Sequence, residues 1–417
     1  MKLSLNIQIL IGAVVGILSG IFLNQIGVEQ PIAANTLYVF GLVGSVFVSM
    51  LKMILIPLVF VSIAVGIANL RKHAQMGRVW KLTLLYYFST TALAVLAGLI
   101  VVNIFKPGVG LEIDMFKEMT TASPINTLTL PQFFENFISQ LFINPIAAMA
   151  NGQIIGTIIF SIIMGIALVI LGDRAEKTIG LMNEFFEIIM LMVSWIMFLL
   201  PIGIMALLGK LVATQDPALF VAVGKYVVVV IGVTLFHGFV ILPAILYLLT
   251  RTNLRTFYVG IRSALITAFS TSSSSATLPI TYRCVTDNLR VDKGVAGFVL
   301  PLGATINMDG TAMYEALAAI FIANLAGIEL NIVQQLTVFF MAIVASIGAP
   351  GIPSAGLVTL IMVLESVGLP VEAAIALLIP IDRPLDAIRT MVNVNGDSIG
   401  SKIIDHYTTP SSLRSKP

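Results

Sequence analysis

The segment from Ile381 to Asp397 carries the side chains best suited to chemistry in this 417-residue chain. It contains three Asp, two Arg and two Asn, although the whole chain is 58% hydrophobic and only 11% charged. Ionisable side chains at membrane depth are costly, and they usually face a bundle interior or a cavity on a substrate or ion pathway. Asp386 and Arg389 stand one helical turn apart, so one small ligand with an ammonium and a carboxylate group can contact both.

These polar residues form one stripe if the segment is helical. At about 100° per residue, six of them fall within about 100° of arc: Asp382, Asp386, Arg389, Thr390, Asn393 and Asp397. The opposite side carries Leu385, Ile388, Met391 and Val394. Two interpretations are open, a binding surface and a set of ion pairs that only lock two helices together. The number of uncompensated oxygens favours binding.

The elements that must position this stripe are membrane-spanning helices. Apolar segments of spanning length occur at 5–27, 37–70, 79–105, 141–171, 179–209 and 217–250. The net charge of +2 argues against nucleic-acid binding, which needs a basic face. A single cysteine and three scattered histidines argue against a disulfide framework and a transition-metal site. We therefore expect an all-α, multi-spanning membrane protein that needs no cofactor.

The distribution of basic residues predicts the orientation in the membrane. Lys and Arg gather between the second and third spans, after the sixth span and at the C-terminal end, whereas the loop at 106–140 is acidic. Because basic loops stay on the cytoplasmic side, both termini are expected in the cytoplasm of a cell-membrane protein.

From residue 255 onward the spans are interrupted. Two segments hold a non-helical tip, at 270–279 and 345–356, between apolar arms too short to cross a bilayer alone. Each is followed by a longer helix with a polar break, so the order is hairpin, helix, hairpin, helix. Repeated discontinuous elements point to the binding site of a transporter, because their free N–H and C=O groups attract anions and cations. A serine-rich linker is the alternative for 270–279.

The longer helix after the first hairpin is expected to unwind near Asp309 and Gly310. Five residues around this point could form an all-oxygen cage: Gly303, Thr305 and Asn307 by their carbonyls, Asp309 and Asp397 by their carboxylates. Hard oxygen ligands suit Na⁺ or another hard cation. A kink with a structural Asp is the alternative interpretation.

Glu315 lies in the same helix at membrane depth. Burial favours the neutral form of a carboxyl group, so this side chain can carry a proton. A carboxyl bonded to a neighbour such as Tyr314 or a lysine, with no proton movement, is equally compatible with the sequence.

The chain resembles the glutamate transporter family, the dicarboxylate/amino acid:cation symporters, over nearly its whole length. The resemblance rests on SSSSATLP at 272–279, NMDGT at 307–311 and RTMVNV at 389–394, which stand in family order and spacing. It implies a secondary-active symporter rather than an enzyme. It also implies eight transmembrane helices plus two re-entrant helical hairpins with inverted repeats, assembled as a homotrimer that works by an elevator mechanism.

The resemblance implies roles for individual residues. Arg389 would bind the side-chain carboxylate of the substrate and Asp386 its α-amino group. The other substrate-binding residues would be Ser273, Ser274, Thr311, Gly351, Ile352, Thr390 and Asn393. A first Na⁺ site would use Asn307, Asp397 and the carbonyls of Gly303 and Arg389, and a second would use Tyr87, Thr90, Thr91, Asn307 and Asp309. A third would use the carbonyls of Thr305, Ser346, Ile347 and Ala349, and Asn393 would be a further Na⁺ ligand. Glu315 would be the proton carrier.

A division of the chain follows from the same resemblance. Residues 1–78 and 141–210 would form a fixed scaffold, the latter with trimerisation helices. Residues 79–140 would hold the third helix of the mobile transport domain and an extracellular loop, and 211–254 its sixth helix. The transport core would span 255–408, and 409–417 would be a cytoplasmic tail.

Import of glutamate or aspartate with Na⁺ is the favoured function, with H⁺ and K⁺ as further candidate coupling ions. A dicarboxylate would leave Asp386 as an unpaired buried charge, and a neutral amino acid would leave Arg389 unpaired. Transport of dicarboxylates or neutral amino acids is therefore less favoured and is the alternative function. A channel or an intramembrane enzyme is a third interpretation. The dispersed His73, His237 and His406, expected to be satisfied or at the surface, give no catalytic pair.

One departure from the family concerns its second arginine near the substrate. This chain has Ser272 and Ala387 at the two positions where members carry that arginine. Arg383 is the candidate replacement, and its reach to Asp386 is open at this point.

Overall fold

The computed structural model describes residues 5–69, 77–111, 135, 138–139, 141–349, 351 and 353–408, and every regular element in these ranges is helical. The first half comprises α1 (Leu5–Ile26), α2 (Pro31–Asn69), α3 (Gly77–Phe105), α6 (Pro145–Ala150), α7 (Ile154–Leu171), η2 (Gly172–Ala175), α8 (Glu176–Phe198) and α9 (Leu200–Thr214). The second comprises α10 (Pro217–Phe236), η3 (His237–Ile241), α11 (Leu242–Thr250), α12 (Leu254–Thr271), α13 (Ser274–Arg283), η4 (Cys284–Asn288), α14 (Lys293–Ile306), α15 (Asp309–Leu325), α16 (Ile332–Gly348), α17 (Ala355–Ser366) and α18 (Val371–Thr408).

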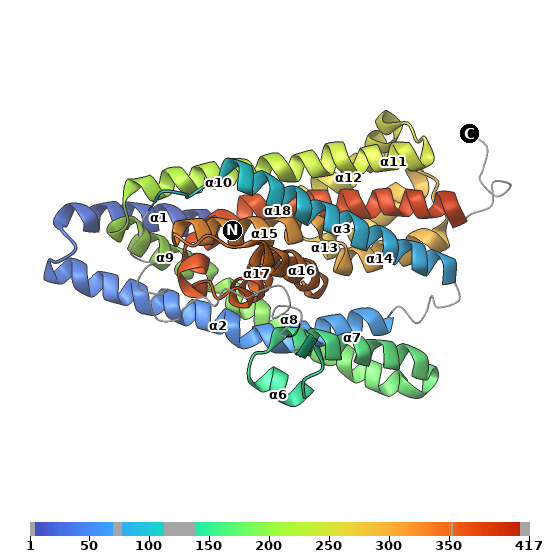
Figure 1. Cartoon of the computed structure of the whole chain (residues 1–417), viewed down its shortest axis with the longest axis horizontal. Coiled ribbons are helices and arrows are strands. Elements are labelled where there is room, and N and C mark those ends of the chain that lie inside the picture. Colours follow the sequence, from blue (N-terminus) through green and yellow to red (C-terminus); the bar gives the residue numbers. More distant parts are fainter. Residues whose placement is uncertain are drawn as a thin grey trace.

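The helix α18 lies in the middle of the second half and is surrounded by it (Figure 1). It packs against α10, α11, α12, α14, α15 and α17. The pairs α12–α13 and α16–α17 each fold back as a hairpin, and α15 packs along α3. The other helices pack mostly among themselves: α1 runs along α9, and α2 contacts α7, α8 and α9.

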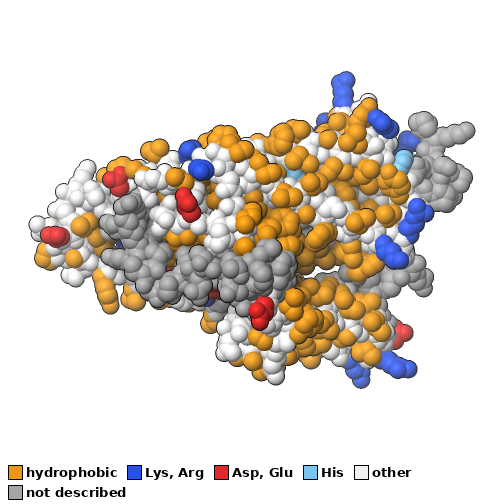
Figure 2. All heavy atoms as spheres, viewed as in Figure 1, with side chains coloured by type: hydrophobic (Ala, Val, Ile, Leu, Met, Phe, Trp, Pro, Cys, Tyr) orange, Lys and Arg blue, Asp and Glu red, His pale blue; other side chains and the backbone are white. Residues whose placement is uncertain are grey.

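The apolar composition produces several helices of membrane-spanning length. Within the described residues these are Ile7–Ile26, Pro31–Ala68, Gly77–Phe105, Ile155–Phe198 and Pro217–Thr250. The expected fourth and fifth spans fall mostly in one of them, because the short η2 keeps the chain helical between α7 and α8. Hydrophobic side chains cover much of the visible face, and most basic side chains on that face gather at its right-hand end (Figure 2). The prediction of an all-helical, multi-pass membrane protein is confirmed.

The structure corrects two local expectations. The sixth span is not a plain helix, because the π-helix η3 interrupts it at His237–Ile241. The prediction of a polar break in the last helix is wrong, since α18 continues through both Pro380 and Pro384 to Thr408. A proline removes one backbone donor, and neighbouring helices stabilise the chain around it. The break that was expected in the longer helix after the first hairpin is present, and it separates α14 from α15.

Candidate functional site

The break between α14 and α15 consists of Asn307 and Met308, two residues before the expected position. Their backbones leave the helical region, with φ −92° and ψ 80° at Asn307 and φ −116° and ψ 56° at Met308. Asp309 then begins α15. The exposed N–H groups at this new helix start need acceptors, and Gly310 N–H donates to Asn393 Oδ1 of α18 at 2.8 Å. The break thus fixes α15 to the polar stripe.

Arg389 is the fully buried centre of that stripe. Its Nη2 donates to Asp382 Oδ1 at 2.6 Å and to Asp386 Oδ1 at 3.0 Å. The guanidinium also lies over the ring of Tyr314, 3.9 Å from the ring centroid. Both carboxylates belong to the same helix as Arg389, so these ion pairs do not lock two helices together. Its Nε and Nη1 have no hydrogen-bond partner among the described residues, which leaves donors for a ligand.

Asp386 connects the stripe to the second hairpin. Its Oδ2 accepts a hydrogen bond from Ser354 N–H at 2.8 Å. Ser354 adopts a left-handed conformation, with φ 61° and ψ 16°, directly before α17. This strained turn aims a backbone donor at the carboxylate. Arg383 also reaches the same oxygen, with 3.9 Å between its Nη1 and Asp386 Oδ2.

The tips of the two hairpins meet at one carbonyl group. Ser272 ends α12 in a left-handed conformation, with φ 50°, and Ser273 then caps α13 by accepting from Ala276 N–H. Ser273 Oγ donates to Gly351 O at 2.7 Å, and Ser275 N–H donates to the same oxygen at 3.2 Å. Because Ser272, Ser273 and Ser274 are buried, the serine run is not a flexible linker.

The residues expected at the first sodium site lie together. Asn307 Nδ2 donates to Asp397 Oδ1 at 2.9 Å, and Asn307 N–H donates to Gly303 O at 2.9 Å. Gly303 is packed so closely that an added Cβ would overlap both Asp397 Oδ1 and Tyr87 Oη. A glycine is therefore needed here for the carboxylate and the phenol to approach the backbone.

The residues expected at the second sodium site also converge. Thr91 Oγ1 donates to Asp309 Oδ1 at 2.7 Å, and Thr90 Oγ1 lies 3.3 Å from the same oxygen and 3.4 Å from Asn307 Oδ1. Sequence reasoning missed a further neighbour, because His237 Nε2 lies 3.0 Å from Asp309 Oδ2. A histidine inside an apolar span was the available signal, since ionisable groups at membrane depth have a functional or structural partner.

Three of the four residues expected at the third sodium site border a cavity. A cavity of about 300 Å³ is lined by Thr305, Ile347 and Ala349 together with Ser275 and Gly351 of the hairpin tips. Its opposite wall comes from α2 and α8. The α16 helix ends here, and the Ser346 carbonyl accepts from Ala349 N–H at 3.2 Å. The carbonyl-rich end of a helix favours a cation.

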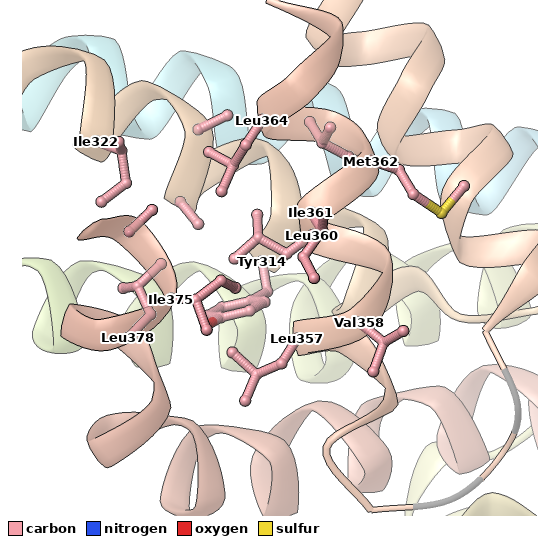
Figure 3. Close-up of a cluster of buried hydrophobic side chains, with 14 of the residues drawn as sticks. Tyr314, Ile322, Leu357, Val358, Leu360, Ile361, Met362, Leu364, Ile375 and Leu378 are labelled. Atoms are coloured by element: carbon pink, nitrogen blue, oxygen red, sulfur yellow. The ribbon is translucent and has the colours of Figure 1, made fainter. Parts of the chain in front are cut away.

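Glu315 is fully buried on α15 and bonds to neither Tyr314 nor a lysine. Thr359 Oγ1 of α17 donates to its Oε1, while Oε2 has no hydrogen-bond partner within the part of the chain that the structure describes. Tyr314 projects into an apolar cluster formed by α15, α17 and α18, where Leu357 and Ile375 lie near it (Figure 3). The carboxyl group of Glu315 is therefore fully buried and has one neutral hydrogen-bond partner among the described residues.

Of the other residues predicted to bind substrate, four are described by the structure and one is not. Ser274, Thr311 and Thr390 are buried in the same region, and Asn393 Nδ2 lies 3.4 Å from Thr311 Oγ1. Ile352 lies outside the described residues. The structure thus places the predicted residues around three centres: Arg389, the pair Asp309 and Asp397, and the hairpin tips with the adjoining cavity.

A buried polar cluster, enclosed by apolar helices and bordered by two hairpin tips, defines a multi-pass membrane transporter rather than an enzyme. The profile of the sodium:dicarboxylate symporter family matches residues 5–407. The chain belongs to this family, so the resemblance noted from the motifs is confirmed.

Individual relatives agree with the family. Excitatory amino acid transporter 3 of Oryctolagus cuniculus is 34% identical over 97% of this chain and 84% of the relative. An excitatory amino acid transporter of Caenorhabditis elegans is 38% identical over 95% of this chain and 86% of the relative. Excitatory amino acid transporter 1 of Ambystoma tigrinum is 37% identical over 88% of this chain and 77% of the relative.

Proposed function

We propose that the chain imports glutamate and aspartate together with Na⁺. The observation that carries the proposal is the buried Arg389, whose guanidinium is held beside the carboxylate of Asp386 next to the tip of the second hairpin. Arg389 would receive the side-chain carboxylate of the substrate, and Asp386 would receive its ammonium group. The relatives named for excitatory amino acid transport support this substrate class.

The remaining substrate contacts follow from the same arrangement. Ser273, Ser274, Thr311, Thr390 and Asn393 would bind the carboxylates with hydroxyl and amide groups. Gly351 and Ile352 would contribute from the second hairpin tip. An acidic amino acid satisfies both Arg389 and Asp386, whereas a neutral amino acid leaves the arginine without its anionic partner.

Na⁺ would travel with the substrate on oxygen ligands. One ion would use Gly303, Asn307, Asp397 and the carbonyl of Arg389. A second would use Tyr87, Thr90, Thr91, Asn307 and Asp309, and a third the carbonyls of Thr305, Ser346, Ile347 and Ala349. The family name supports Na⁺ as the coupling ion. Asn393 links the substrate and ion regions through Gly310.

Glu315 would carry a proton through the transport cycle. Its full burial and its neutral hydrogen-bond partner, Thr359, favour a carboxyl group that gains and loses a proton with conformation. K⁺ counter-transport is the other candidate coupling.

The mechanism that fits this arrangement is an elevator. The scaffold would comprise residues 1–78 and 141–210, and the moving transport domain would comprise 79–140, 211–254 and 255–408. The mutual packing of α1, α2, α7, α8 and α9 supports this division. A homotrimer in the cell membrane, with eight transmembrane helices, two hairpins and both termini in the cytoplasm, completes the proposal.

Uptake of radiolabelled substrate into proteoliposomes tests the proposal. Gradients of Na⁺, H⁺ and K⁺ are imposed separately, with L-aspartate, L-glutamate and L-alanine as substrates. Accumulation of the two acidic amino acids that requires an inward Na⁺ gradient supports it. Accumulation of alanine alone, or acidic amino acid uptake indifferent to Na⁺, would contradict it.

A further inference from the structure

The two oxygens of Asp386 have different positively charged neighbours. Oδ1 accepts from Arg389 Nη2 at 3.0 Å, whereas Oδ2 lies 3.9 Å from Arg383 Nη1. Both arginines stand three residues from Asp386 on α18, one on each side in sequence. The backbone N–H of Ser354 also donates to Oδ2. Asp386 is therefore held between two guanidinium groups and the tip of the second hairpin.

The two arginines differ in their surroundings. The side chain of Arg389 is 1% exposed and has a second carboxylate partner in Asp382, at 2.6 Å. The side chain of Arg383 is 14% exposed. The pairing distance of 3.9 Å at Arg383 is also longer than a hydrogen bond. The contact of Arg383 with Asp386 is thus mainly a charge interaction, and a stronger cationic donor can displace it.

This arrangement has a consequence for ligands with and without an amino group. The ammonium of an acidic amino acid must compete with Arg383 for Oδ2 of Asp386. A dicarboxylate without an ammonium can engage Arg389 and still leave Asp386 beside the positive charge of Arg383. The penalty for an unpaired buried carboxylate, which would otherwise exclude such a ligand, is then reduced.

We propose that Arg383 is a specificity-determining residue that acts through Asp386 and lowers the preference for amino acids over dicarboxylates. The proposal rests on the proposed function, because it assumes that Asp386 receives the substrate ammonium. Arg383 keeps Asp386 partly neutralised in the absence of an ammonium, and it weakens the binding of an ammonium when one arrives.

The test compares the binding of L-aspartate and succinate to the full chain in proteoliposomes. The measured quantity is the ratio of the succinate inhibition constant to the aspartate KM, for the unmodified protein, Arg383→Gln and Arg383→Lys. Arg255→Gln serves as the matched control, since Arg255 is exposed on α12. We expect Arg383→Gln to raise the ratio about two- to fivefold, a change within the range of partly exposed ion pairs. Arg383→Lys, which keeps the positive charge, should restore the ratio.

The outcomes separate the specificity proposal from the proposed function. An unchanged ratio in Arg383→Gln, or an equal rise in Arg383→Lys, overturns the role of Arg383 while aspartate uptake stands. If the glutamine variant fails to fold, the unmodified protein still decides, because succinate must compete with aspartate for uptake. Absence of competition at high succinate overturns the proposal. If the unmodified protein does not take up aspartate, both the role of Arg383 and the proposed function are overturned.

Discussion

Replacing Arg389 with cysteine removes the centre of the proposed substrate site. The substitution leaves Asp382 and Asp386 without the guanidinium that lies 2.6 and 3.0 Å from them. A substrate carboxylate loses two charge-assisted hydrogen bonds of about 1.5–3 kcal/mol each, which weakens binding by about 10² to 10⁴-fold. Two buried carboxylates without their cation also lower the free energy of unfolding by about 3–5 kcal/mol.

Proteoliposome uptake of L-aspartate and L-glutamate under an inward Na⁺ gradient measures the effect of Arg389→Cys. We expect acidic substrates to be lost at ordinary concentrations, and neutral amino acids such as L-serine to gain access. Arg389→Lys separates charge from shape, because lysine keeps the positive charge and loses the planar fork. Its KM should lie between those of the unmodified and cysteine proteins. Unchanged aspartate uptake by the cysteine variant would refute the assignment of Arg389.

Three further substitutions address the ions and their surroundings. Glu315→Gln should make net uptake insensitive to an imposed pH gradient while substrate exchange continues, because the amide stays neutral in every state. Gly303→Ala should raise the half-saturating Na⁺ concentration in uptake about tenfold, or ~1.4 kcal/mol, because its Cβ would displace Asp397. His237→Leu should lower the apparent Tm in detergent, because the loss of its contact with Asp309 costs about 1–3 kcal/mol.

Matched controls exist for these experiments. Gly224→Ala on α10 adds a Cβ into open space, so its Na⁺ dependence should stay that of the unmodified protein. His237→Gln keeps a hydrogen-bond donor and should lower the apparent Tm less than leucine does. Equal effects of Gly303→Ala and Gly224→Ala would remove the steric argument. A persistent pH response in Glu315→Gln would show that another group carries the proton.

Periodicity and charge predicted the polar face of α18 because a stripe of ionisable residues in an apolar helix has few structural explanations. Asp386, Arg389 and Asn393 do share one buried face, and Asp397 continues it toward Asn307. The helix break also followed from sequence to within two residues, since Asp309–Gly310 follows directly on the residues that unwind.

Other features could not be read from spacing. The contact of His237 with Asp309 joins residues 72 apart, and helical periodicity says nothing about such distant pairs. The π-helix that places His237 has no single-residue signature comparable to a proline or glycine. The expected break in α18 was wrong because tertiary packing maintains a helix across Pro380 and Pro384.

The shared carbonyl at the hairpin tips has a consequence for directionality. Gly351 O accepts both Ser273 Oγ and Ser275 N–H. In the proposed transport cycle, the same two hydrogen bonds break whichever hairpin moves away, at about 0.5–1.5 kcal/mol each. Their contribution is therefore equal for opening toward either side of the membrane and cancels from the difference between the two barriers. In that cycle this contact would oppose separation of the tips equally in both directions, so any preference for one side would come from the ions, the substrate and the helices behind each tip.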